Sequence, residues 1–113
     1  MQPFFYTDLE YIRSMFLYNI TIIAESDSAS DVGNRIRDFK DQYGSDEREY
    51  SVKFLKLLES PHEGVTYCLQ LQVESQNQIL RFQQLHLQGL QTALEQQYPG
   101  KVLYFESVME YLS

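Results

Sequence analysis

The sequence has few of the residues that carry covalent or cofactor chemistry. Cys68 is the single cysteine among 113 residues, so an internal disulfide is excluded and a reducing compartment, the cytoplasm, is expected. There is no tryptophan, and the two histidines are His62 and His86. The sequence has no glycine-rich phosphate loop, no nucleophile elbow and no paired metal motif. We therefore expect no metal, no cofactor and none of the enzyme classes that depend on these motifs.

Basic residues and long apolar runs are also scarce. Nine Lys and Arg residues stand against sixteen Asp and Glu residues, and the net charge is -7. Such a surface repels phosphate backbones and anionic lipid headgroups, so we expect neither nucleic acid nor a membrane as partner. No apolar run reaches the length of a membrane span, and no signal peptide is recognisable. With 43% hydrophobic residues, the chain should fold as one soluble domain.

Hydrophobic periodicity predicts six secondary-structure elements. A period of two indicates strands and a period near 3.6 indicates helices. Ser28 and Asp31 have the spacing of a capping box at the start of the first helix, and Pro99-Gly100 ends the second. The patterns predict strands over 16–24, 50–59, 65–75 and 101–106, and helices over 29–43 and 76–97.

The order β-α-β-β-α-β, with a hairpin in the middle, is typical of one α+β architecture. It predicts a ferredoxin-like βαββαβ fold, in which a four-stranded antiparallel sheet has both helices on one face. The other face of the sheet is then open. Its predicted side chains are a mixture of apolar and polar residues: Leu17, Asn19, Thr21, Ile23, Lys53, Leu55, Leu57, Cys68, Gln70 and Gln72. This mixture favours a homodimer that pairs through the open face, the alternative being a monomer with a solvated face.

Several short motifs resemble one known family. They are YNIT at 18–21, GVTY at 64–67, FQQLH at 82–86 and GK at 100–101. In this order and spacing they resemble the family catalogued as domain of unknown function 4286, over residues 15 to about 112. That family is similar to the dimeric α/β-barrel superfamily, so the resemblance implies a ferredoxin-like fold and sheet-to-sheet pairing. The superfamily includes cofactor-free monooxygenases, haem-dependent enzymes, isomerases and ligand-binding regulatory domains, which leaves the function open.

His86 is the main candidate for a functional residue. Ile79, Phe82, Leu85, Leu90 and Ala93 share its side of the second helix, so the imidazole should face the sheet. The resemblance implies a cavity between sheet and helices, toward which Tyr18 and Tyr67 project. These three side chains are the predicted ligand-binding residues. In the alternative interpretation, His86 is a neutral core residue. No carboxylate lies at helical spacing beside it, so no catalytic residue is predicted.

The remaining candidates have structural interpretations. His62, beside Glu63 in the hairpin turn, lacks the further ligands that a metal site needs, and Cys68 has no neighbouring cation to activate its thiol. Residues 1–14 are expected to be an N-terminal extension before a domain at 15–113, with three alternatives: a docking segment, a disordered tail or the product of an upstream start site. The leading hypothesis is a non-catalytic homodimer that binds a small molecule or another protein. The alternative is a small cofactor-independent enzyme that uses His86 with Tyr18 or Tyr67.

Overall fold

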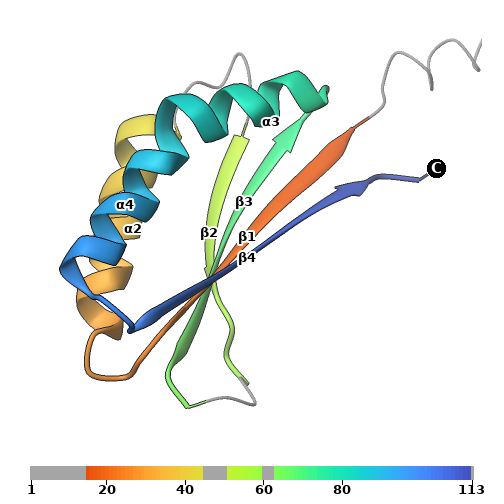
Figure 1. The fold of residues 1–113 in the computed structure, drawn as a ribbon. Coiled ribbons are helices and arrows are strands. Elements are labelled where there is room, and N and C mark those ends of the chain that lie inside the picture. The colour runs from red at the N-terminus through yellow and green to blue at the C-terminus, as the bar shows by residue number, and fades with distance from the viewer. Residues whose placement is uncertain (1–14, 45–50, 60–62, 113) are drawn as a thin grey trace, which may run out of the picture.

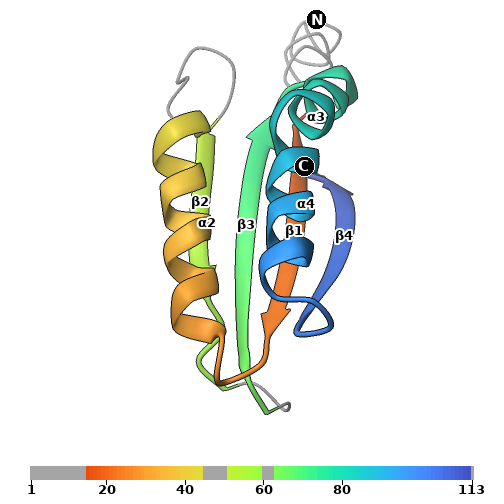
Figure 2. The same ribbon diagram turned by 60° about the vertical axis from the view of Figure 1, so that its left-hand side comes forward.

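The computed structural model describes residues 15–44, 51–59 and 63–112. Its elements are β1 (Phe16–Ala24), α2 (Ala29–Tyr43), β2 (Ser51–Lys56), β3 (Val65–Val73), α3 (Gln76–Phe82), the π-helical turn η1 (Gln83–Leu87), α4 (Gln88–Gln97) and β4 (Val102–Glu110). The strands form one antiparallel sheet with the order β2-β3-β1-β4 (Figure 2). Both helical segments cover the same face of this sheet (Figure 1). The predicted ferredoxin-like fold is confirmed.

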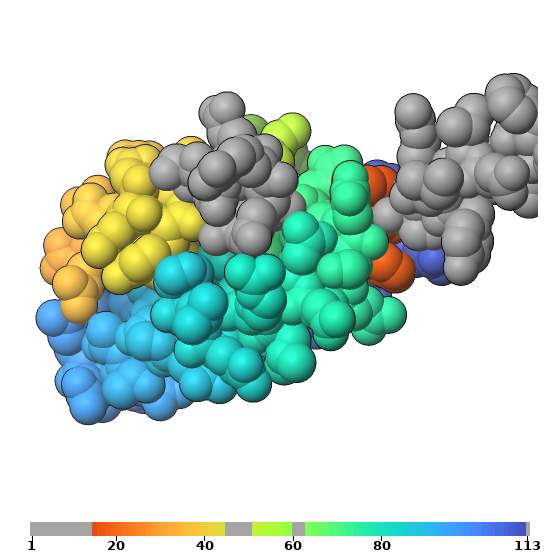
Figure 3. Space-filling model, turned by 90° about the horizontal axis from the view of Figure 1, so that it is seen from above, coloured from red at the N-terminus to blue at the C-terminus, as the bar shows by residue number. Residues whose placement is uncertain are grey.

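The core lies between the sheet and the helices. Tyr18, Ile20 and Ile22 alternate along β1 as buried residues, and the side chains between them are only partly buried. Because successive side chains of a strand point to opposite faces, this alternation separates a helix-covered face from an open face. In the space-filling view from above, α2 lies beside the α3–α4 segment and forms one layer with it (Figure 3). No helix of the described residues is long and apolar enough to cross a membrane.

Three predicted strand boundaries shift in the structure. The second strand, predicted over 50–59, is β2 (Ser51–Lys56), with Tyr50 outside the described residues. The third strand ends at Val73, because Ser75 instead caps α3. The fourth strand continues past 106 to Glu110, and its register with β1 extends to the Phe16–Glu110 pair. Since the stretch after 106 is polar in part and forms a sheet edge, pairing rather than periodicity defines its end.

The second predicted helix contains a π turn that the periodicity did not reveal. Its buried residues Phe82 and Leu87 are five positions apart, which suits the wider turn of η1. The extra residue rotates the later part of the segment relative to the earlier part. Leu85, predicted on the apolar side, is therefore 67% exposed, and Leu87 is buried in its place.

The two helix starts are capped differently. Ser28, the predicted capping-box residue of α2, makes no side-chain cap and donates its hydroxyl to Asp27 Oδ1 instead (3.1 Å). A full capping box is present at α3, where Ser75 Oγ accepts from Gln78 N and Gln78 Oε1 accepts from Ser75 N. The predicted extension at 1–14 lies outside the described residues.

Candidate functional site

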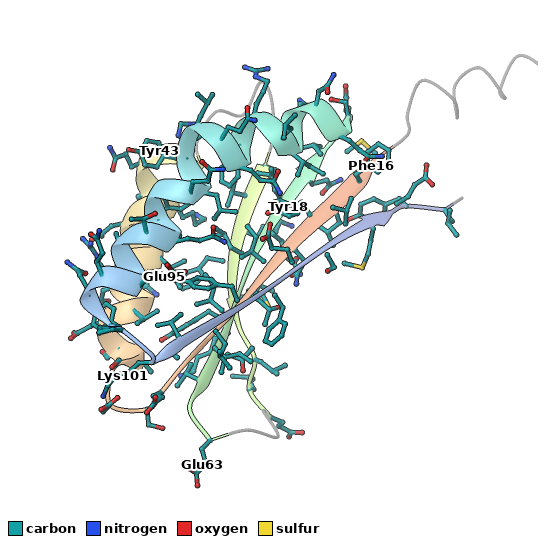
Figure 4. The ribbon with its side chains drawn as sticks, viewed as in Figure 1. Phe16, Tyr18, Tyr43, Glu63, Glu95 and Lys101 are labelled. Carbon is teal, nitrogen blue, oxygen red and sulfur yellow. The ribbon has the colours of Figure 1, made fainter. Side chains whose placement is uncertain are left out.

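Tyr18 lies at the centre of a polar network between the sheet and the π turn. Its ring is buried, and Figure 4 shows it between β1 and the helical segment. The hydroxyl donates to Glu106 Oε1, and Gln83 Nε2 donates both to the Tyr18 hydroxyl (3.0 Å) and to Glu106 Oε1 (3.3 Å). Burial, and then the hydrogen bond to Glu106, raise the pKa of Tyr18 well above its usual range. The phenol is therefore a neutral donor that ties β1 to β4 and to η1.

His86, predicted to face the sheet, packs against α2 from the π turn. Its half-buried ring stacks on Tyr43 of α2, with centroids 4.4 Å apart and planes at 21°, and meets Phe82 edge-on at 5.7 Å. Phe39 in turn lies 5.8 Å from Phe82, so aromatic rings fill this side of the imidazole. Nδ1 is buried and has no hydrogen-bond partner among the described residues. A buried polar atom without a partner is uncommon and marks this position as unusual.

Tyr67 has a packing role. Its hydroxyl donates to the carbonyl oxygen of Ala29 (2.8 Å), and its ring packs against Phe54 at 5.4 Å. The hydroxyl occupies space that a side chain at Gly33 would need, because a Cβ there would lie 2.5 Å from the Tyr67 oxygen. The missing side chain of Gly33 therefore lets β3 dock its tyrosine onto α2.

The three predicted ligand-binding residues share the helix-covered side without meeting at one point. In the sheet register Tyr18 is opposite Leu71, and Tyr67 is opposite Ile22. The two tyrosines are therefore separated by four residues along the strands, about 13 Å. Each has its own protein partners, and His86 contacts neither network in the described interactions.

Three residues of this region were not predicted from the sequence. Gln83 and Glu106 complete the Tyr18 network, and Tyr43 supplies the stacking partner of His86. Extended alternation of β4 would have placed Glu106 on the helix-covered face, but nothing in the sequence marks it as a partner of Tyr18. Gln83 is the first residue of the π turn, where its side chain lies within hydrogen-bond distance of the Tyr18 hydroxyl.

Tyr104 is a partly buried tyrosine on the helix-covered side of β4. Its hydroxyl oxygen is buried and has no hydrogen-bond partner among the described residues. Burial, with a smaller contribution from the charge of Glu95, raises the pKa of Tyr104 to about 12. Unlike Tyr18, this phenol carries a desolvation cost without a visible compensating bond.

Among the residues that the structure describes, the other titratable candidates form no reactive cluster. Cys68 is a partly buried free thiol on the open face, with its sulfur 4.0 Å from Thr21 Oγ1. His62 lies outside the described residues. Within the part of the chain that the structure describes, no group of three or more His, Cys, Asp or Glu side chains is placed to hold a metal ion.

The open face of the sheet combines exposed apolar side chains with little charge. Leu103 and Phe105 of β4 are 61% and 56% exposed, and Met109 is 46% exposed. Asn19 and Gln70 bond to one another in the middle of this face (3.1 Å). Among the described strand positions of this face, one residue is charged, Lys53. The predicted mixed character of the open face is confirmed.

A shallow pocket of about 350 Å³ lies at one end of the open face. Ile23, Leu103 and Phe105 line it from the sheet, and Gly100 and Lys101 line it from the turn before β4. Figure 4 shows Lys101 and Glu63 at this same end of the molecule. The Lys101 ammonium lies 2.5 Å from Asp27 Oδ2, which raises the pKa of Lys101 and lowers that of Asp27.

Comparison with families of known proteins gives one match over almost the whole chain. The family model described as Domain of unknown function (DUF4286) matches residues 15–112. No curated protein matches the sequence.

Solved structures with the same fold include natural proteins and a designed one. A proposed antibiotic biosynthesis monooxygenase from Caulobacter crescentus CB15 is 12% identical, with a TM-score of 0.66 over 96% of this chain and 99% of that one. A dabb family protein with a ferredoxin-like fold from Mesorhizobium loti MAFF303099 is 12% identical, with a TM-score of 0.53 over 88% and 97%. The de novo designed protein Foldit4 is 9% identical, with a TM-score of 0.50 over 88% and 98%. At such identities the likeness establishes the fold alone.

Proposed function

The chain belongs to the family described as Domain of unknown function (DUF4286), and we propose that it acts as a non-catalytic interaction protein that assembles as a homodimer through the open face of its sheet. The observation that carries this proposal is the exposure of Leu103, Phe105 and Met109 on a face that is nearly free of charge. Contiguous exposed apolar surface is characteristic of interaction sites, and interface cores are depleted in charged residues.

The charge distribution supports pairing through this face. Two copies of a chain with net charge -7 repel one another unless their carboxylates stay apart. The open face meets this condition, because its described strand positions carry one cation, Lys53, and no carboxylate. Glu106 and Glu110, the carboxylates of β4, lie on the helix-covered side of the sheet.

The size of the face also suits a stable pair. Three of the strands have nine residues and are about 30 Å long, and β2 has six and is about 20 Å long, so at the usual spacing of about 4.8 Å the planar footprint is near 530 Å². Protruding side chains make the accessible area larger than this footprint. A standard interface buries about 800 Å² per partner, which is of the same order.

A pair of neighbouring residues provides a matched test. Phe105 and Val108 are exposed to a similar degree, 56% and 48%, but lie on opposite faces of β4. In the homodimer, Phe105→Lys places an amine in the interface and Val108→Lys does not. Light scattering after size exclusion should find a dimer for the wild type and for Val108→Lys, and a monomer with an unchanged circular dichroism spectrum for Phe105→Lys. A wild-type monomer, or equal effects of both variants, contradicts the proposal.

The assembling unit in this proposal is the domain at 15–113, with 1–14 as an extension outside it. We place the dimer in the cytoplasm, consistent with a single free cysteine.

A second candidate is a small-molecule site at the π turn, used either for binding or for cofactor-independent catalysis by His86 with Tyr18 or Tyr67. The buried Nδ1 of His86 without a partner favours it, because a ligand donor would satisfy that atom. π turns are also frequent at functional sites. The test is a screen of small metabolites by ¹⁵N and ¹H chemical shifts of the His86 ring. A compound class that moves the ring signals in wild type but not in Tyr43→Ala supports the site, and no response across the library rejects it.

A further inference from the structure

The open face carries most of its apolar strand residues along β1 and β4. Leu17 pairs with Met109 at one end of these strands, and Ile23 pairs with Leu103 at the other. The residues between the two ends are largely polar, with Asn19 opposite Ser107 and Thr21 opposite Phe105. We call this set the apolar stripe: Leu17, Ile23, Leu103, Phe105 and Met109.

The two ends of the apolar stripe differ in shape. The Ile23 end is hollowed by the pocket of about 350 Å³, whose sheet wall is Ile23, Leu103 and Phe105. Glu25, Glu63 and Lys101 also line the pocket, and the Lys101 ammonium lies 2.5 Å from Asp27 Oδ2. The apolar contact that the pocket offers therefore comes from its sheet wall. At the other end, Met109 projects from β4 with 46% of its surface exposed.

Resting on the proposed homodimer, we infer that Met109 of a second copy fills this pocket. The dimer axis then crosses the strands at the row of Ile20 and Glu106, midway between the two ends of the stripe. This axis lies between the two sheets and is perpendicular to the strands, so β4 of one copy faces β4 of the second copy and the two strands are antiparallel. It brings Leu103 over Met109 and Ile23 over Leu17 in both halves of the interface, so one contact is made twice.

The same axis matches the polar middle of the face. Asn19 comes over Thr21 of the second copy, and both residues carry groups that donate and accept hydrogen bonds. Within one chain Asn19 Nδ2 already donates to Thr21 Oγ1 (3.0 Å), so the side chains can bond to each other. Polar groups buried at the centre of the interface would therefore find partners.

An axis parallel to the strands and between β1 and β4 fits the face less well. It also lays apolar ends on apolar ends, but it brings the pocket of one copy over the pocket of the other. Two hollows leave a void, and packed interfaces reach the density of protein interiors. The flexible thioether of methionine suits an irregular hollow, which favours the crossed arrangement.

Cysteine cross-linking distinguishes the two arrangements. On one strand, positions 103 and 109 are six residues apart, about 20 Å, whereas facing sheets lie about 10 Å apart. We would replace Cys68 by serine and prepare Leu103→Cys, Met109→Cys and the double variant, each checked for dimerisation by light scattering. A bismaleimide with a reach of about 10 Å should link the double variant, and an equal mixture of the two single variants, into covalent dimers. Neither single variant alone should be linked.

Each other outcome has a defined meaning. Linking of Leu103→Cys alone overturns the inference, because in the crossed arrangement two copies of position 103 are about 20 Å apart along the strands. Dimers that resist linking in the double variant also overturn it, while the proposed homodimer stands. If light scattering finds the wild type and the Cys68→Ser chain to be monomeric, the proposed function fails first.

Discussion

The close approach of Tyr67 to Gly33 predicts that Gly33→Ala lowers the free energy of unfolding in the wild type and raises it when Tyr67 is replaced by leucine. Alanine at 33 should strengthen α2 by its helix propensity, worth about 1 kcal/mol over glycine. Its Cβ, however, would lie 2.5 Å from the Tyr67 hydroxyl oxygen and 2.8 Å from Cζ. The ring must therefore move, and its hydrogen bond to Ala29 breaks.

The expected magnitude follows from three terms. The lost hydrogen bond costs about 1 kcal/mol, and overpacking costs roughly 1 to 3 kcal/mol. After the helix-propensity gain of about 1 kcal/mol is subtracted, Gly33→Ala should lower the free energy of unfolding by roughly 1 to 3 kcal/mol. In a Tyr67→Leu background the ring is absent, so the same substitution should raise the free energy of unfolding by about 1 kcal/mol.

Urea denaturation of the four chains of this cycle, at one protein concentration, measures both values. Circular dichroism follows the transition, and the fitted slopes should agree among the four chains. The reasoning is refuted if Gly33→Ala stabilises the wild type, or if its effect is equal in the two backgrounds.

The phenols of Tyr18 and Tyr104 should respond oppositely to loss of the hydroxyl: Tyr18→Phe should lower the free energy of unfolding by about 1 kcal/mol, whereas Tyr104→Phe should leave it unchanged or raise it. Thermal melts of the two variants compare these effects directly, and equal losses would contradict the assigned bonding. Because folding raises both pKa values, ionisation of these phenols favours the unfolded chain, so the free energy of unfolding should be constant below about pH 10 and fall as the pH rises further, for Tyr104 through about 12. Melts from pH 9 to 12 should show this decline, with a smaller decline in Tyr104→Phe. Ser75→Ala removes a formed capping box and should cost about 1 kcal/mol, but Ser28→Ala removes no cap and should cost less; the reverse order in urea titrations would contradict the two cap geometries.

Much of the candidate site depended on contacts between distant parts of the chain. The Tyr18 hydroxyl bonds to Glu106, which is 88 positions away in the sequence, and to Gln83, which is 65 positions away. Tyr18 was predicted to face the helices, as observed, because the alternation along its strand specifies the face. Its partners were not predicted, since hydrogen bonding between side chains leaves no periodic pattern in the sequence.

The helix around His86 shows the same division. Apolar spacing predicted the helix, which the structure confirms, and it predicted that the imidazole faces the sheet, whereas the ring stacks on Tyr43 of the neighbouring helix α2. The π turn was missed, because a five-residue step from Phe82 to Leu87 looks like an ordinary irregularity in an apolar arc. Leu85 was consequently assigned to the wrong side, and the burial of Leu87 was not predicted.

The sequence by itself determined the element order, the two faces of the first three strands and the mixed character of the open face. These follow from side-chain periods of 2 and 3.6, which the covalent geometry of the backbone sets locally. Tertiary structure decided the length of β4, the π turn, the docking of Tyr67 at Gly33 and the hollow at the Ile23 end of the sheet. Each of these depends on packing between segments far apart in the chain, where available space and the need to satisfy buried polar atoms outweigh local preference.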